Sequence, residues 1–503
     1  MAGFNELTAS EYEGIWNSPE AIQSRLTIKS RQNYYDGIHA IVNSNRTSVD
    51  GNSKSERVAN FIKYGIDMYV GSIVGDPISV TASEVDDGEE VNESPSVYRA
   101  IAKDNSFDTT DVTNTRNAYI AGYGIETHEY DSGANAYVIT AQNPIQWHIV
   151  FDSNSGLLGA IHMSKVDAGQ FYQGALLKND LDIMVVFTDK DIITFHKMAD
   201  TKDGKWYEPE SAPRSPHQFG APPVVVWNIN DGYESHITDD LIGQQDEYNE
   251  ADSDSGDGLK FDTDGILAIK GYSIAEVKEA SETLRQWKMF PLPADGDIKF
   301  VAKNTDFARI ESRIARTREH IFTALGVPDI EEIVGATGDT SGIALGLKFK
   351  PMQDNAKSMI AYLRAGVRKR IDLINTVKRA TGGAIEDVQV NITFDLPVNR
   401  VEQWQNIGSV TGIVSHTKQL EMLDDVHDPD QELKRLDAER ENTGFIDRNN
   451  LSPEALTVQN DREIEQQSLE LAPKIDAAIQ AIADAATANL NKQISKQPKA
   501  PDA

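Results

Sequence analysis

The stretch Val334-Gly-Ala-Thr-Gly-Asp-Thr-Ser-Gly-Ile-Ala-Leu-Gly-Leu-Lys348 is the most informative part of the sequence, because a glycine-rich segment runs there into a long helical pattern. Gly335, Gly338 and Gly342 leave the backbone free to change shape. Pro351 predicts a kink or a late start of the helix. The stretch therefore predicts a mobile loop joined to a long bent helix. The apolar residues at helical spacing are Met352, Ala356, Met359, Ile360, Leu363, Val367, Ile371 and Ile374.

This stretch lacks the residues of known phosphate-binding and hydrolase loops. A P-loop ends in Gly-Lys-Ser/Thr, whereas Lys348 follows Leu347. The dinucleotide pattern G-x-G-x-x-G is absent, and Ser341 does not stand in a G-x-S-x-G context. The His residues are scattered, and no H-E-x-x-H occurs. The sequence predicts a flexible polar loop and no catalytic residue; the alternative is an active site that only the fold assembles.

Composition sets further limits. The 503 residues include 48 basic and 79 acidic side chains, giving a formal net charge of -31. Such a chain should be soluble and should repel phosphate backbones, so tight non-specific DNA binding is not expected. The absence of Cys excludes disulfides and Cys-based zinc sites, and no apolar run is long enough to cross a bilayer. Residues 252–258 resemble a calcium loop only faintly, because Asp257 stands where Gly is required. A helix end or turn is the better interpretation, and no metal or cofactor is predicted.

Residues 1–234 combine helical and β patterns, which predicts a mixed α+β domain. A helix is expected over residues 57–70, ended by Gly75-Asp-Pro77. Further helices are expected near 97–102 and 112–121. Short β-branched or aromatic runs, separated by turns at 152–156 and 203–204, predict strands; the runs are 137–140, 147–151, 183–188, 192–196 and 224–227.

An insertion at residues 235–325 reads as an antiparallel stalk that carries a cap. Its first helix is predicted to start with Ser235 as N-cap and to weaken at Gly256 and Gly258. A second helix spans 305–325 and ends at Gly326 and Pro328. Between them the pattern predicts a strand at 266–270, a short helix at 274–287 and a strand at 298–301.

The two stalk helices have opposite charge. Arg309, Arg313 and Arg316 share one face of the second helix, opposite an apolar stripe. A solvated basic face is one interpretation. The other is contact with another subunit, because the polar first helix needs a neighbour. The acidic residues of the first helix are Asp239, Asp240, Asp246, Glu247, Glu250, Asp252 and Asp254, and the stripe of the second is Phe307, Ile310, Ile314, Ile321 and Leu325.

The C-terminal part is predicted as a strand at 388–394, closed by Pro397, followed by helices. Asp428-Pro-Asp-Gln431 has the pattern of a helix start. An Ala-rich last helix near 475–490 precedes a tail at 497–503 that should be disordered.

Several motifs occur in a characteristic order along the chain. They are Asn45-Arg-Thr-Ser48 with Tyr69-Val-Gly-Ser-Ile-Val-Gly-Asp-Pro-Ile-Ser79, Val334-Gly-Ala-Thr-Gly338 before a long helix, Arg364-Ala-Gly-Val-Arg368 within it, and Val410-Thr-Gly-Ile-Val-Ser-His-Thr417 with Asp428-Pro-Asp-Gln-Glu-Leu-Lys-Arg435. Their order resembles that in one known family, the portal proteins of tailed double-stranded DNA bacteriophages of the siphophage type.

The resemblance implies an α+β fold, mainly α, with an α/β wing, a two-helix stem, a small α/β clip, a long kinked helix and a helical crown. The implied regions are the wing at 1–234, stem helix 1 at 235–262, the clip at 263–304, stem helix 2 at 305–327, the tunnel loop, long helix and wing strand at 328–400, and the crown with a disordered tail at 401–503.

The same resemblance implies a non-enzymatic conduit: a homo-oligomeric ring of twelve at the capsid vertex of the virion, assembled in the host cytoplasm. Double-stranded DNA would be packaged and ejected through it. The resemblance also implies contacts with terminase, a head–tail adaptor, scaffold and major capsid proteins, and no contact with membranes. The alternatives are a hydrolase-type enzyme on the α+β domain and a non-portal structural or adaptor protein.

The resemblance also assigns site residues, without a cofactor or metal. The tunnel loop lining the DNA channel would contain Glu331, Glu332, Gly335, Thr337, Gly338, Asp339, Thr340 and Ser341. Inter-subunit contacts of the stem would involve Asp246, Glu247, Glu250, Arg309, Arg313 and Arg316, and the clip would bind partners through Trp287, Met289 and Phe290.

Overall fold

The computed structural model describes residues 3–42, 44–47, 54–83, 92–154, 156–198, 205–210, 214–264, 266–270, 296–301, 306–329, 331, 342–395, 414–421, 426 and 432–438. The chain divides into two compact units, Met1–Asn406 and Ile407–Ala503. In the second unit, α12 (His416–Glu421) and residues 432–438 are helical. The predicted turn at 203–204, the helices at 274–287 and 475–490, the helix start at 428–431 and the tail at 497–503 lie outside the described residues.

Five helices of the first unit come early in the chain: α1 (Ala9–Trp16), α2 (Pro19–Tyr35), α3 (Phe61–Val74), α4 (Ser94–Asp104) and α5 (Phe107–Ala121). Two short 3-10 turns, η1 (Phe4–Glu6) and η2 (Pro144–Gln146), accompany them. The three predicted helices correspond to α3, α4 and α5. The prediction starts α3 four residues too early, because residues before Phe61 bind another helix in an extended conformation.

The predicted β-rich region forms antiparallel sheets. One has the order β11 (Val224–Asn228), β2 (Tyr123–Asp131), β3 (Ala136–Gln142). The other has the order β10 (Ser215–Pro216), β9 (Asp191–Met198), β8 (Leu181–Phe187), β5 (Leu157–Val166), β4 (Trp147–Phe151). A short hairpin pairs β6 (Phe171–Tyr172) with β7 (Ala175–Leu176). The five predicted strands are confirmed as β3, β4, β8, β9 and β11. The turn at 152–156 is confirmed too, since Asp152 donates its N–H to the Gly156 carbonyl at 2.8 Å.

The five-stranded sheet is covered on both faces. Ala160 and Phe187 are cross-strand partners that pack with Trp147 in one core. Their neighbours Ile161 and Val186 point the other way and pack against Tyr12 of α1. Because both faces are buried, the sequences of these strands are runs of apolar residues and do not alternate between polar and apolar residues.

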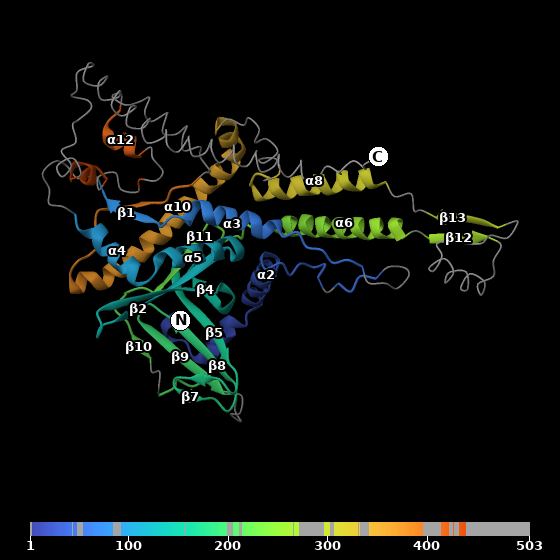
Figure 1. Cartoon of the computed structure of the whole chain (residues 1–503). Helices are drawn as coiled ribbons and strands as arrows, with labels where there is room; N and C mark the ends of the chain where they lie inside the picture. Colours follow the sequence, from blue (N-terminus) through green and yellow to red (C-terminus); the bar gives the residue numbers. More distant parts are fainter. Residues whose placement is uncertain are drawn as a thin grey trace, which may run out of the picture. The chain divides into compact units, whose positions relative to one another are not determined.

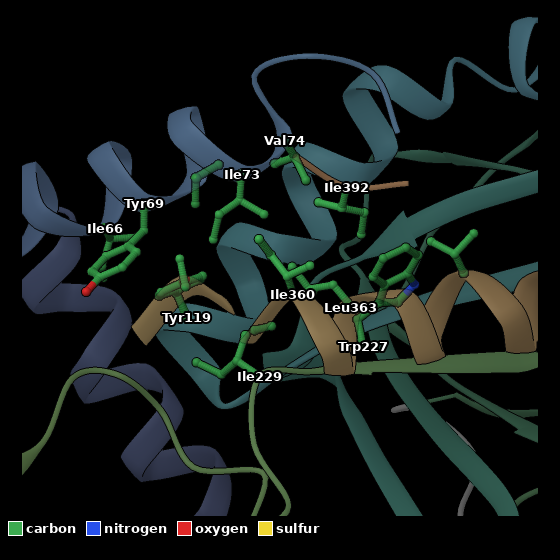
Figure 2. Packing of buried hydrophobic residues seen from close by; sticks show 14 of the residues in the cluster. Ile66, Tyr69, Ile73, Val74, Tyr119, Trp227, Ile229, Ile360, Leu363 and Ile392 are labelled. Carbon is green, nitrogen blue, oxygen red and sulfur yellow. The ribbon is translucent and has the colours of Figure 1, made fainter. Parts of the chain in front are cut away.

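The main core lies where α3, α5, β11 and α10 (Gly342–Thr381) meet (Figure 2). α10 has Pro351 inside it. A proline lacks the N–H that would bind the carbonyl four residues earlier, here that of Leu347. β1 (Ser79–Ala82) pairs with β14 (Val388–Asn391), so the predicted strand at 388–394 is confirmed over its first half. The predicted stripe of α10 is confirmed: Met359 is partly buried, and Met352, Ala356, Ile360, Leu363, Val367, Ile371 and Ile374 are buried.

The insertion consists of two helices side by side with a hairpin (Figure 1). α6 (Asp239–Asp264) leads into β12 (Ile266–Lys270), which pairs antiparallel with β13 (Asp297–Val301), and α8 (Phe307–Leu325) follows. Gly326 ends α8 in a left-handed conformation, as predicted. Two predictions for α6 are wrong. Its start is capped by Thr238, whose Oγ1 accepts the Leu241 N–H, whereas the Ser235 hydroxyl binds the carbonyls of α5. The helix also continues through residues 252–258, which form neither a helix end nor a turn.

Arg370 of α10 is fully buried and joins three elements. Its Nε donates to Glu126 Oε1 of β2 at 2.9 Å, and its Nη2 donates to Asp111 of α5. The guanidinium carbon lies 4.0 Å from the ring centroid of Phe107 and 4.8 Å from that of Trp227. Burial raises the pKa of Asp111 to about 6. Burial also acts to raise the pKa of Glu126, but the charge of Arg370 and the hydrogen bonds from Arg370 and His128 together outweigh it and lower that pKa to about 2.

Candidate functional site

Only one of the predicted channel residues, Glu331, is among the described residues. It lies six residues beyond the end of α8 and is exposed. α10 begins at Gly342, immediately after the predicted loop. The other predicted channel residues lie outside the described part of the chain: Glu332, Gly335, Thr337, Gly338, Asp339, Thr340 and Ser341.

Arg318 of α8 binds the chain that leaves the same helix. Its Nη2 donates to Asp329 Oδ1 at 2.8 Å, and its Nη1 donates to Glu331 Oε2 at 2.5 Å. Asp329 Oδ1 also accepts the N–H of Glu331 at 3.0 Å. The guanidinium carbon lies 5.6 Å from the ring centroids of both Phe61 and Phe322. Two carboxylates and two ring contacts thus fix one arginine, which the sequence analysis did not single out.

A groove of about 1330 Å³ opens beside this arginine. Tyr248 and Asp252 of α6 line the groove. Several residues of α8 line it too, among them Arg316 and Arg318. The first turns of α10 form another wall, where Leu347 is 68% exposed. The groove therefore combines acidic, basic and apolar side chains, and Glu331 lies on its edge.

The three predicted stem arginines differ in their contacts. Arg313 donates from Nη2 to Glu247 Oε1 at 2.9 Å and from Nε to the same oxygen at 3.1 Å. This pair joins α8 to α6 within one chain. Arg309 and Arg316 are exposed and have no ion-pair partner among the described residues. Of these three arginines, only Arg313 is therefore paired within the described part of the chain.

Three of the acidic residues of α6, Asp246, Glu250 and Asp254, bind an earlier part of the same chain. Asp246 accepts a hydrogen bond from the Tyr34 hydroxyl at 2.6 Å. Glu250 lies 3.5 Å from the guanidinium of Arg46, and Asp254 lies 2.8 Å from it. The predicted stem acids Asp246, Glu247 and Glu250 therefore all have partners within the chain.

Residues 54–60, which we call the strap, run along α6 and lead into Phe61, the first residue of α3. The buried residues of α6 from Gln245 to Ser253 are polar, and side chains at every fourth position of α6 accept alternate N–H groups of the strap and of Phe61. Four helical residues rise about 6 Å, while two extended residues advance about 6.6 Å. A side chain at every fourth position therefore meets every second strap N–H. The pairs are Ser55 with Asp257 at 2.8 Å, Arg57 with Ser253 at 3.0 Å, Ala59 with Asn249 at 3.1 Å and Phe61 with Gln245 at 3.2 Å.

The polar helix α6 needs a neighbour to hold it, and the strap is such a neighbour within the chain. Contact of α6 with another subunit stays a prediction; within the chain, the strap backbone is a neighbour of matching polarity. Gly256, expected to weaken the helix, lies where the Arg57 guanidinium approaches, since a Cβ there would be 2.8 Å from Nη1. The available signal was a polar repeat at every fourth residue, Gln245, Asn249 and Ser253, which are all fully buried.

The predicted clip residues Trp287, Met289 and Phe290 lie outside the described residues, although both predicted clip strands are confirmed as β12 and β13. Within the described part of the chain, no group of three or more His, Asp or Glu side chains could bind a metal ion. None of the described helices is long and apolar enough to cross a membrane.

The chain is similar to known proteins in two comparisons. One solved structure with a similar chain is "Neck of empty GTA particle computed with C6 symmetry"; the identity is 12%, the TM-score is 0.43, and the similarity covers 71% of this chain and 88% of the other. No curated protein matches the sequence. The family described as "Phage portal protein, SPP1 Gp6-like" matches residues 19–444. The chain therefore belongs to the SPP1 Gp6-like family of phage portal proteins.

Proposed function

We propose that twelve copies of this chain form a ring at one capsid vertex, through which double-stranded DNA is packaged and ejected. The family match over residues 19–444 carries this proposal. The side-by-side helices α6 and α8, their hairpin and the long helix α10 fit a stem, a clip and the helix that follows a tunnel loop. The chain is not proposed as an enzyme, so a separate terminase would supply the energy of packaging. The net charge of -31 fits a conduit that repels phosphates.

The test is the size and shape of the purified full-length protein. Light scattering should give the mass of a uniform ring, and negative-stain images should show rings with an open centre. A monomer at all concentrations, with or without the partner capsid proteins, would contradict the proposal. The ring number follows from the symmetry of averaged top views.

We assign residues 1–234 to the wing, 235–262 and 305–327 to the stem and 263–304 to the clip. Residues 328–400 would contain the tunnel loop, the long helix kinked at Pro351 and a wing strand. Residues 401–503 would form the crown. This assignment is supported by the hairpin at the ends of α6 and α8 and by the pairing of β14 with β1.

In the stem, Arg309 and Arg316 are proposed to bind acidic residues of a neighbouring subunit. They are exposed and lack a partner among the described residues, whereas Arg313 is paired with Glu247. Reversing both charges with Arg309→Glu and Arg316→Glu should lower the yield of rings, more strongly at low salt. Arg313→Glu is the comparison and should have the smaller effect on assembly, because its partner lies in the same chain. Equal ring yields for all variants at low salt would contradict the assignment.

The clip would bind terminase and the head–tail adaptor through Trp287, Met289 and Phe290. An apolar exposed patch commonly marks a protein interface. Deleting residues 274–287 should abolish binding of both partners while the wing stays folded, which circular dichroism and pull-down measurements would check. Retained binding of both partners would place their site elsewhere.

The loop from Glu331 to Ser341 would line the channel and move during translocation. Its acidic residues repel phosphate and it contains no basic side chain. Gly338→Pro restricts the backbone, so rings and proheads should form while DNA packaging falls. Normal packaging by this variant would exclude a moving loop.

A further inference from the structure

The turn after α8 is fixed from several sides up to Asp329. The carbonyl of Leu325 lies 3.0 Å from His236 Nε2, and the carbonyl of Gly326 accepts the Tyr69 hydroxyl at 3.2 Å. Val327 is buried. The chain therefore leaves α8 along one path, and Glu331, the next described residue after Asp329, makes an exposed contact.

The two carboxylates on Arg318 differ in exposure. The Arg318 and Asp329 side chains are 22% and 17% exposed, whereas that of Glu331 is 74% exposed. A half-buried charge pair exchanges less readily with water than an exposed one. Asp329 thus holds the arginine in the less exposed of the two contacts, and the more exposed Glu331 lines the adjoining groove.

We propose that Arg318 is the positioning residue for the channel loop: it fixes Glu331, where that loop begins, to the second stem helix. The inference rests on the proposed portal function. An arginine suits the task because its fork donates to two carboxylates at once, and the rings of Phe61 and Phe322 restrict its orientation. The Glu331 contact should weaken as salt is raised.

The decisive variants are Glu331→Gln and Arg318→Met, with Arg318→Lys as the conservative change. A matched control is Lys165→Met, which removes an exposed pair with Asp180 in the five-stranded sheet. Hydrogen exchange reports the N–H of Glu331 directly. We expect exchange to accelerate roughly 2- to 5-fold in the first two variants, the size expected for an exposed charge pair, and less in Arg318→Lys.

Packaging provides the second readout. Glu331→Gln and Arg318→Met rings should package DNA roughly 2- to 5-fold more slowly, while Lys165→Met rings package normally. Because Glu331 is exposed, Glu331→Gln should fold and assemble even if Arg318→Met does not. A merely structural role would lower thermal stability without changing packaging by intact rings.

These outcomes distinguish a failure of the inference on Arg318 from a failure of the proposed portal function. Unchanged exchange and unchanged packaging in Glu331→Gln, with wild-type rings active, would overturn this inference alone. A wild-type chain that forms no ring would overturn the proposed function. Faster exchange in such a chain would confirm the contact and overturn its assignment to a channel loop.

Discussion

α10 and α6 are both long helices, but they bind the rest of the protein in opposite ways. α10 has 40 residues and buries an apolar stripe that includes Leu363 and Val367 in the main core. α6 has 26 residues and buries the amides of Gln245 and Asn249 against the strap backbone. The positional repeat is similar in both. Helical periodicity therefore identifies the buried face, while the residue type on it identifies whether side chains or a backbone lie opposite.

The largest expected effect comes from placing a polar amide, of the kind that α6 buries, in the apolar stripe of α10. Leu363→Asn removes a fully buried apolar side chain and leaves an amide without partners. We expect a loss of about 4 kcal/mol in unfolding free energy, from the range of core truncations and buried unpaired groups. Chemical denaturation followed by circular dichroism measures it. Leu363→Met, which conserves volume, should cost less than about 1.5 kcal/mol.

The reciprocal exchange, Asn249→Leu, would make α6 look more like an ordinary amphipathic helix. It should nevertheless destabilise the protein by about 2–3 kcal/mol, because the half-buried Ala59 N–H and the buried His39 ring lose a partner. The same denaturation experiment applies, with the exposed Glu247→Gln as control at under about 1 kcal/mol. A stabilised Asn249→Leu protein would show that the strap contacts contribute little.

A glycine pair in α6 sharpens the comparison. Ala at position 258 would have Phe307 Cε1 at 4.0 Å, an ordinary contact, so Gly258→Ala should stabilise by about 1 kcal/mol through helix propensity. Ala at position 256 would displace the Arg57 guanidinium. Gly256→Ala should therefore gain less than Gly258→Ala, as differences in thermal midpoint would show. Equal gains in thermal midpoint would mean that the Arg57 side chain moves aside without a loss of stability.

The smallest expected effect is a pH dependence of the strap. Asn249 Nδ2 donates to His39 Nδ1 at 2.8 Å, and the other ring nitrogen lies 2.9 Å from the Tyr34 carbonyl, so this ring is neutral. Burial lowers the pKa of His39 below its usual 6.5. The folded chain thus binds this proton less readily than the unfolded chain, and the stability from His39 is lost as pH falls below 6.5.

The measurement is the thermal midpoint between pH 7.5 and 5.0 for wild type and His39→Gln. The wild type should lose more stability on acidification than the variant. Parallel curves for the two proteins would remove His39 from the pH response.

Sequence patterns predicted the parts of the fold in which apolar side chains pack together. The α10 stripe, α3, β8 and β9 are examples, since their burial follows from local periodicity. The polar repeat of α6 indicates a polar neighbour, but it could not identify the strap as that neighbour, because the contacts join backbone N–H groups to side chains far along the sequence. Arg370 was hidden for a related reason: an arginine on a helix usually faces solvent, and only the fold brings Asp111 and Glu126 to it.

Of the candidate site, the sequence singled out Arg313 and Glu331 but not the side chains that they bind within the chain. The contact of Arg313 with a neighbouring subunit stays a prediction; within the chain, Arg313 of α8 binds Glu247 of α6. Arg318 was not singled out, because its two carboxylates lie beyond the helix end, where periodicity gives no information.

The strap also delays the folding of the N-terminal segment while the chain is being synthesised. Ala59 leaves the ribosome 190 residues before Asn249, the side chain that accepts its N–H. At about 5–20 residues per second, the wait is roughly 10–40 s. During that time the strap's N–H groups lack their acceptors on α6, and the positive charges of Arg46, Lys54 and Arg57 discourage pairing with another nascent chain. The completion of α6 therefore sets the earliest moment at which the N-terminal segment can adopt its final conformation.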